Sequence, residues 1–180
     1  MIVIVGESAS GKSSVEKYLI EQFGYEKVIS YTTREKRENE IDGVDYHFVN
    51  MSKFEEMYNS DVFLETAIYN NWCYGSLIQD YYKNSEKKIA VLTPHGLRQL
   101  KKYSGINVNS IYISIPRRER LIKILERGDD IEESYRRNLS DVGQFDGIED
   151  EVDLIIDNSG YKKSIKDIAS IIHTYFTTCK

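Results

Sequence analysis

The sequence predicts an α/β fold in which helices flank a parallel sheet. Short, continuous apolar runs indicate strands that are buried on both faces, as in a sheet covered by helices on each side. Helical segments lie between these runs, and this alternation is typical of parallel α/β architecture. A glycine-rich segment joins the first apolar run to the first helix. The apolar runs lie at residues 2–5, 89–92, 111–115 and 154–156.

The glycine-rich segment carries the most specific chemistry in the chain. Residues 6–14 read GESASGKSS, which matches the pattern G-x-x-x-x-G-K-[ST] of phosphate-binding loops. Its glycines let backbone N–H groups point into one cavity, and the next helix adds the positive end of its dipole. Lys12 can reach the β- and γ-phosphates of ATP, and Ser13 can bind Mg2+. We therefore predict a P-loop NTPase-type sheet, with nucleotide bound by Gly6, Ser8, Ala9, Ser10, Gly11, Lys12, Ser13 and Ser14.

Helical periodicity places a helix after each of the four strands. Residues 12–23 have apolar side chains at helical spacing, and Gly24 supplies a stop. Shorter helices are expected over residues 96–103 and 121–126. Residues 161–176 carry apolar side chains on one face, which predicts an amphipathic helix that packs on the sheet.

Two segments interrupt the alternation of strands and helices. Residues 34–80 have β-rich character with several turns, and we interpret them as a small mixed or antiparallel insert over the carboxyl edge of the sheet. Residues 117–140 are dense in charges of both signs and differ from the rest of the core. The expected core therefore consists of residues 1–33, 81–116 and 141–180.

Composition limits the classes of function. The 180 residues are 41% hydrophobic, enough for one sizeable core. A net charge of −5 argues against a general nucleic-acid or membrane surface, and no apolar run approaches the ~20 residues of a membrane span. Cys73 and Cys179 form no disulfide or metal motif. A strand expected from Ile2 leaves no room for a signal peptide, so we expect a cytoplasmic protein without nucleic-acid or membrane partners.

Several segments after the loop resemble guanylate kinases. The resemblance runs from residue 2 to about residue 160, in order and at compatible spacing, and the chain is identified as a member of the guanylate-kinase-like family. An arginine pair, Arg34 and Arg37, is suited to hold a monophosphate through bidentate hydrogen bonds. The matching segments are YTTR at 31–34, EIDGVDYHFV at 40–49, FLE at 63–65, YGS at 74–76, ERG at 126–128 and EES at 132–134.

The resemblance implies an acceptor site and a lid. Residues 34–80 would be the nucleoside monophosphate-binding insert and residues 117–140 a helical lid that closes over ATP. The acceptor phosphate would be held by Arg34, Arg37, Tyr46 and Tyr74, and guanine would be read by Ser30, Glu65, Ser76 and the residue at position 93. Catalysis would involve Lys12, Arg34 and the lid residues Arg127 and Arg137, with Lys123 nearby and Asn158 near the adenine; a turn asparagine is the competing explanation for Asn158.

The chain departs from the family pattern at several positions. The family's third strand typically ends Leu-Asp-Ile-Asp, whereas this chain has Val91 and Thr93 in place of the aspartates. Thr93 can hydrogen-bond to guanine but carries no charge. Val91 cannot replace a carboxylate, so metal binding would rest on Ser13, the phosphates and water. Glu7 stands where the family usually has proline, and an acid there should weaken phosphate binding unless it points away. Asn138 replaces the second lid arginine, so Arg136 or Arg137 would have to substitute for it.

These departures leave three hypotheses. The first is a Mg2+- and ATP-dependent kinase that converts GMP or dGMP to the diphosphate. The second keeps the fold but changes the acceptor to another (deoxy)nucleotide or a phosphorylated sugar, because Thr93 lacks a carboxylate. The third is a non-catalytic binding module similar to the guanylate-kinase domains of scaffold proteins, because Val91 removes a metal carboxylate. The intact phosphate loop favours an enzyme.

Overall fold

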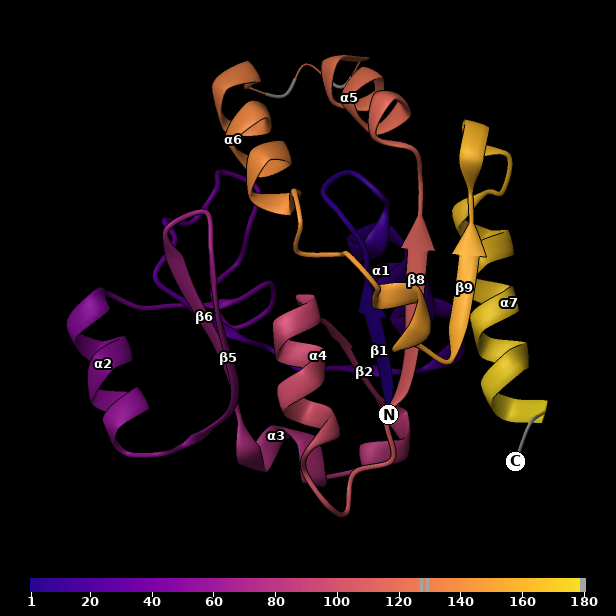
Figure 1. Ribbon diagram of the computed structural model, residues 1–180. Helices are drawn as coiled ribbons and strands as arrows, with labels where there is room; N and C mark the ends of the chain where they lie inside the picture. Colours follow the sequence, from indigo (N-terminus) through magenta and orange to yellow (C-terminus); the bar gives the residue numbers. More distant parts are fainter. Residues whose placement is uncertain (127, 129, 179–180) are drawn as a thin grey trace.

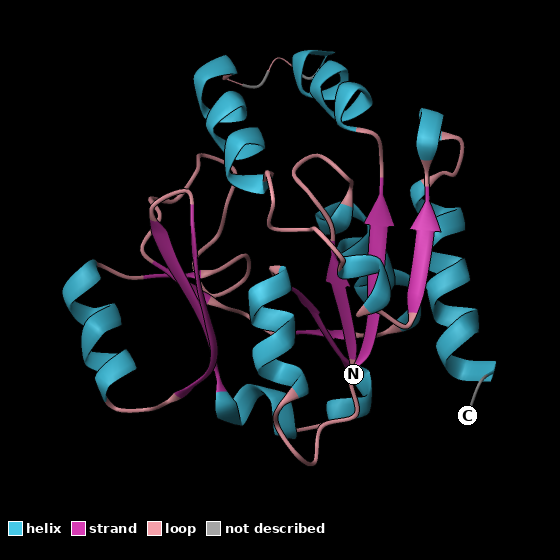
Figure 2. Cartoon of the chain, viewed as in Figure 1, coloured by secondary structure: helices cyan, strands magenta, loops and turns pink. Residues whose placement is uncertain are grey.

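The computed structural model describes residues 1–126, 128 and 130–178, and in it helices cover both faces of a parallel sheet (Figures 1 and 2). The strand order β2-β7-β1-β8-β9 puts β1 in the centre, paired in parallel with β7 and β8. The predicted α/β class is confirmed. The strands are β1 (Ile2–Val5), β2 (Glu26–Lys27), β7 (Lys88–Val91), β8 (Asn109–Ser114) and β9 (Leu154–Asp157).

Each face of the sheet packs against its own helices. Val3 and Val5 of β1 belong to a buried cluster with Leu97 of α4 (Pro94–Lys101). Ile4 points to the other face and packs in a second cluster with Leu19 of α1 (Lys12–Phe23) and with α7 (Ile165–Thr178). Successive side chains of a strand point to opposite faces, so a continuous apolar run fits a doubly covered sheet.

The helices largely follow the sequence prediction. The first helix has the predicted bounds, Lys12–Phe23, and Gly24 ends it with a φ of 70°. The helix expected at residue 96 begins at Pro94, because the Thr93 side chain accepts a hydrogen bond from the Gly96 N–H and proline suits the first helical position. Four further short helices connect the strands and helices described so far: α3 (Ile78–Tyr82), η1 (Ser85–Lys87), η2 (Ile148–Asp150) and η3 (Ser159–Tyr161).

The insert contains a second, mixed sheet, as predicted. Its order is β4-β3-β6-β5, with β3 and β4 parallel and the other pairs antiparallel. The sheet also takes in β3, which precedes residue 34, the expected start of the insert. A helix not foreseen from the sequence, α2 (Met51–Asn59), follows an Asn50 cap. The strands are β3 (Tyr31–Thr32), β4 (His47–Phe48), β5 (Phe63–Tyr69) and β6 (Trp72–Leu77).

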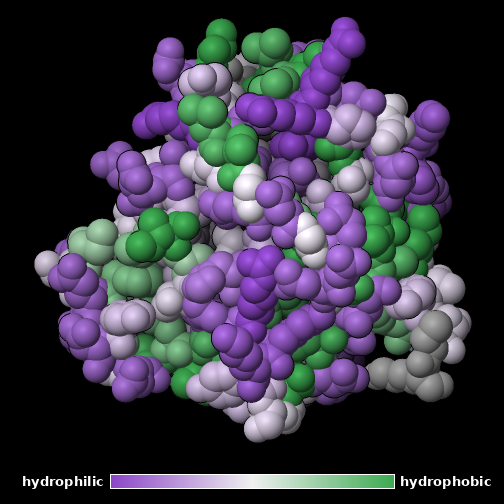
Figure 3. Space-filling view, in the orientation of Figure 1, coloured by the Kyte–Doolittle hydropathy of each residue, from purple (hydrophilic) through white to green (hydrophobic). Residues whose placement is uncertain are grey.

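Two helices stand above the carboxyl edge of the large sheet at the position expected for the lid (Figure 1). They are α5 (Arg117–Glu126) and α6 (Ile131–Asp141). Helix α5 begins four residues before residue 121, where the sequence predicted the start of a helix. Their outer surface mixes hydrophobic and hydrophilic side chains, with Leu125, Ile131 and Leu139 exposed (Figure 3). Within the described part of the chain, no helix combines the length and the apolar character that crossing a membrane requires.

Candidate active site

The phosphate loop follows β1 at the centre of the sheet, and its glycines are required by geometry. A Cβ at Gly6 would lie 2.9 Å from the Ile113 carbonyl oxygen, so only glycine fits beside β8. Gly11 has a φ of 89° immediately before α1, a conformation that favours glycine. The loop therefore approaches the neighbouring strand closely and then turns into the helix N-terminus.

Lys12 lies folded along the loop. Its Nζ donates to the Glu7 carbonyl oxygen at 2.8 Å. Burial lowers the pKa of Lys12 to about 8, and the nearby carboxylates of Asp141 and Glu7 act in the opposite direction. The ammonium group therefore remains largely charged at neutral pH and is available to phosphate oxygens.

The Glu7 carboxylate has two hydrogen-bond partners from β8 and α5. The Tyr112 hydroxyl donates to its Oε2 at 3.0 Å, and the buried Arg120 donates from Nη2 to its Oε1 at 3.3 Å. Arg120 balances the negative charge of Glu7, and weaker phosphate binding caused by an acid at this position stays a prediction. Arg120 was not singled out from the sequence, because it lies among many other charged residues.

Helix α6 contacts the loop through Asp141, its last residue. The Ser8 N–H donates to Asp141 Oδ2 at 2.8 Å, and the Tyr69 hydroxyl donates to Oδ1 at 3.0 Å. Tyr69 lies at the end of β5, and its hydroxyl also lies 2.7 Å from Ser8 Oγ. The loop, the second sheet and α6 therefore meet at one carboxylate, which was not predicted from the sequence.

The residues expected to hold the acceptor phosphate lie together in the insert. The Arg34 guanidinium lies 5.4 Å from the centre of the Tyr46 ring, and the Tyr46 and Tyr74 rings are 5.9 Å apart. Glu40 organises both arginines: Arg34 Nη2 donates to its Oε1 at 2.7 Å, and the Arg37 N–H donates to its Oε2 at 2.9 Å. Burial raises the pKa of Tyr46 to about 12, so its hydroxyl keeps its proton.

The residues expected to read guanine form one chain of hydrogen bonds. Ser30 Oγ and Ser76 Oγ are 2.7 Å apart, and Ser76 Oγ donates to Glu65 Oε1 at 2.7 Å. Glu65 is buried, and burial raises its pKa to about 6. The carboxylate is therefore charged at neutral pH and can accept hydrogen bonds from a buried ligand.

Two positions that depart from the family pattern have structural roles in this chain. Thr93 caps α4, with its Oγ1 accepting from the Gly96 N–H at 3.1 Å. Val91 packs against the apolar core on the α1 side of the sheet. A guanine contact from Thr93 would have to share the oxygen that caps the helix, and it stays a prediction.

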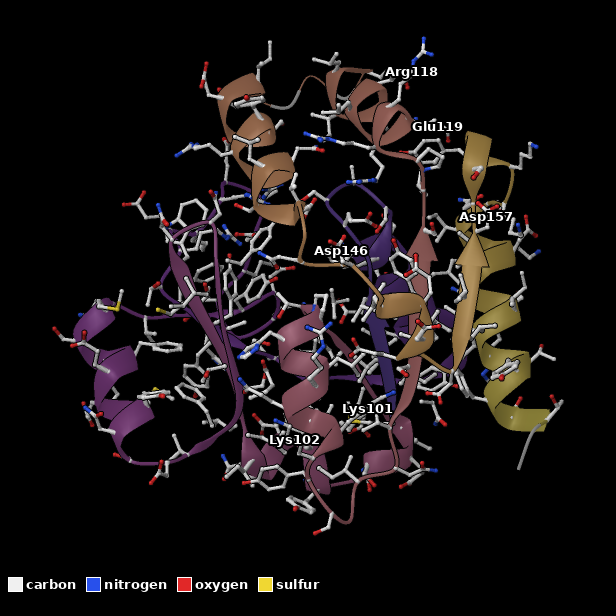
Figure 4. All side chains as sticks on the ribbon, viewed as in Figure 1. Lys101, Lys102, Arg118, Glu119, Asp146 and Asp157 are labelled. Carbon is white, nitrogen blue, oxygen red and sulfur yellow. The ribbon has the colours of Figure 1, made fainter. Side chains whose placement is uncertain are left out.

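Asn158 and Lys123, expected near the adenine and in the lid, contact residues close to the carboxyl end of β9. Asn158 is buried and hydrogen-bonds the Lys163 backbone through both its oxygen and its nitrogen. Lys123 Nζ lies 5.7 Å from the centre of the Tyr161 ring. The α5 helix is tied to η3 because Glu119 accepts from the Gly160 N–H at 2.6 Å, and Figure 4 places Glu119 close to the end of β9.

Of the two arginines predicted to act in catalysis from residues 117–140, the structure describes one. Arg127 lies outside the described residues. The Arg137 carbonyl oxygen lies 3.2 Å from the Tyr69 hydroxyl, which places this turn of α6 beside the insert. Asn138 is 1% exposed, and within the described part of the chain neither its Oδ1 nor its Nδ2 has a hydrogen-bond partner.

The site combines a loop that matches the phosphate-binding pattern with a separate group of arginine, tyrosine, serine and glutamate side chains in the second sheet and the loops beside it. Such a fold and site define a nucleotide-binding phosphotransferase. The sequence model of the guanylate kinase family, described as "Guanylate kinase", matches residues 1–175. The chain belongs to the guanylate kinase family.

Individual relatives agree with the family match. The guanylate kinase of Mycoplasma genitalium is 32% identical over 183 residues, covering 98% of this chain and 76% of that protein. The guanylate kinase of Fusobacterium nucleatum is 32% identical over 177 residues, covering 96% of this chain and 95% of that protein. The crystal structure of guanylate kinase from Anaplasma phagocytophilum superposes with a TM-score of 0.77 at 23% identity, covering 99% and 84% of the two chains.

Proposed function

We propose that this protein transfers the γ-phosphoryl group of ATP to GMP or dGMP, giving ADP and the corresponding diphosphate. The observation that carries this proposal is the hydrogen-bonded chain from Ser30 through Ser76 to the buried Glu65. A carboxylate can accept from both N1–H and the exocyclic amine of guanine, a pair of donors that adenine lacks. The acceptor alternatives, another nucleotide or a phosphorylated sugar, have no comparable support.

The geometry supports a division of roles among the parts of the chain. Residues 34–80 are proposed to bind the acceptor, with Arg34, Arg37, Tyr46 and Tyr74 on its phosphate. The core of residues 1–33, 81–116 and 141–180 is proposed to bind ATP through the loop, and residues 117–140 are proposed to form the lid. The acceptor's attacking oxygen belongs to an ionised phosphate, so no general base is needed. Positioning and charge neutralisation by Lys12 and the arginines then lower the barrier.

The proposed metal is Mg2+ bound together with ATP. Ser13, at the start of α1, offers a hydroxyl, and no group of three or more His, Cys, Asp or Glu side chains that could hold a metal occurs among the residues the structure describes. A site made of one hydroxyl, phosphate oxygens and water suits Mg2+, which keeps much of its hydration shell. When bound, the ion would neutralise charge on the phosphates.

An acceptor panel tests the proposal. Formation of ADP from Mg-ATP is measured with GMP, dGMP, AMP, CMP, UMP and dTMP, with Lys12→Ala as the inactive control. Turnover with GMP or dGMP that is lost in the control supports the proposal. Turnover only with another acceptor would show a kinase that is specific for that acceptor and not for GMP. Nucleotide binding without any turnover would indicate a binding module.

A further inference from the structure

Hydrogen-bond donors and cations surround the carboxylate of Asp141 as they would surround a bound anion. The Ser8 N–H donates at 2.8 Å and the Tyr69 hydroxyl at 3.0 Å, and Arg120 Nη1 lies 3.5 Å away. Asp141 and Arg120 are 7% and 3% exposed. The Lys12 side chain, in the same loop, interacts electrostatically with Asp141. A backbone N–H of the phosphate loop with a lysine and an arginine nearby is the environment that phosphate oxygens occupy in proteins.

Arg120 is held in this position by contacts that do not involve Asp141. Its Nε donates to the Ile115 carbonyl oxygen at 3.0 Å, and its Nη1 donates to the Ser8 carbonyl oxygen at 3.2 Å. Its Nη2 donates to Glu7 at 3.3 Å. These three anchors come from the end of β8 and from the loop itself. The guanidinium would therefore stay beside the loop if the Asp141 side chain moved away.

A second observation on the same helix points to a ligand. Asn138 lies one turn before Asp141, so both side chains are on one face of α6. The Asn138 amide is buried, and its oxygen and nitrogen have no hydrogen-bond partner within the described part of the chain. Leaving a buried amide unpaired costs free energy, so a group that binds here would be expected to supply a partner. A phosphate oxygen would satisfy the Nδ2 donor.

We propose that Arg120 is an additional phosphate-binding residue of this enzyme, and that the Asp141 carboxylate occupies the position of a phosphate oxygen until ATP binds. The proposal rests on ATP being the donor nucleotide. An incoming phosphate repels the Asp141 carboxylate and takes over its donors, while Arg120 stays anchored by Glu7 and Ile115. Arg120 then supplies a positive charge at the loop in a chain where the lid position 138 is an asparagine.

Removing the charge of Asp141 tests this competition directly. Asp141→Asn keeps the shape of the side chain and an oxygen acceptor for the Ser8 N–H but removes the negative charge. Binding of ATP without any acceptor, measured by calorimetry, should tighten about tenfold, equivalent to ~1.4 kcal/mol. Asp150→Asn, which changes an exposed carboxylate on η2, is the matched control and should leave ATP binding unchanged.

Arg120→Lys tests the other half of the proposal. The expected result is ATP binding weakened about tenfold or more, with the KM for GMP unchanged and a melting curve that shows a folded protein. Weaker or unchanged ATP binding in Asp141→Asn would show that the carboxylate is a structural strap, and this would overturn the proposal. Unchanged ATP binding in Arg120→Lys would also overturn it. The measurements that decide the proposal are of ATP binding without an acceptor, so failure to phosphorylate GMP would not affect them.

Discussion

Replacing Glu65 with glutamine should stabilise the protein at neutral pH and remove its recognition of guanine. Glu65 is 3% exposed, and burial raises its pKa from 4.5 to about 6. The folded state therefore binds the proton more tightly than the unfolded state, and the charged carboxylate is a cost to folding. The difference of roughly 1.5 pKa units, at 1.36 kcal/mol per unit, corresponds to ~2 kcal/mol.

The pH dependence gives the sign of the effect. The cost is fully present above the folded pKa of about 6, shrinks as pH falls, and is absent below the unfolded pKa of 4.5. Glutamine never carries the charge, so Glu65→Gln should melt about 4–8 °C higher than the native protein at about pH 7.5. The two melting temperatures should converge near pH 4. Thermal unfolding followed by circular dichroism across this pH range measures the difference.

The same substitution should damage substrate binding. Glutamine presents an N–H2 group where guanine requires a second acceptor, so the KM for GMP should rise about a hundredfold or more. Glu55→Gln, an exposed substitution on α2, is the matched control and should change neither property. A Glu65→Gln protein that melts at or below the native temperature near pH 7.5, or that keeps the native KM for GMP, would refute this reasoning.

Three further substitutions probe the loop and the acceptor site. Lys12→Ala should lower kcat by about a hundredfold or more, because it removes a positive charge that neutralises the phosphates; near-native turnover would contradict this role of Lys12. Gly96→Ala places a Cβ 2.8 Å from Glu65 Oε2 and should raise the KM for GMP about tenfold; an equal rise in the KM for ATP would contradict this. Ala9 has a φ of 64°, so Ala9→Gly should raise the free energy of unfolding by about 0.5–1 kcal/mol; a lower melting temperature would count against strain at this position.

Features that depend on neighbouring residues could be predicted from the sequence. The first helix has the predicted bounds because its apolar spacing, the loop before it and Gly24 after it are all local signals. By contrast, β2 has only two residues and gives no periodic pattern. Helix α2 was hidden within a segment interpreted as β-rich, although Asn50 at its start is a recognisable cap.

The contacts around the phosphate loop could not be read from the sequence, because they join distant segments. Ser8 and Asp141 are 133 positions apart, and Arg120 and Glu7 are 113 apart. No local pattern pairs such residues. One signal was available for Arg120: it lies four residues before Ile124, and both are buried on one face of α5. A charged residue on the apolar side of a helix would have indicated a buried partner.

The position of β1 in the sheet has a consequence for the order of events during synthesis. Val3 pairs with Ala90 on one side and with Ser110 on the other. The ribosome must therefore complete more than half of the chain before β1 has both neighbours and the loop has a sheet beneath it. Asp141 is added later still. During this interval an apolar strand lacks at least one of its neighbours, so the nascent chain is exposed to aggregation before it can be stabilised by nucleotide.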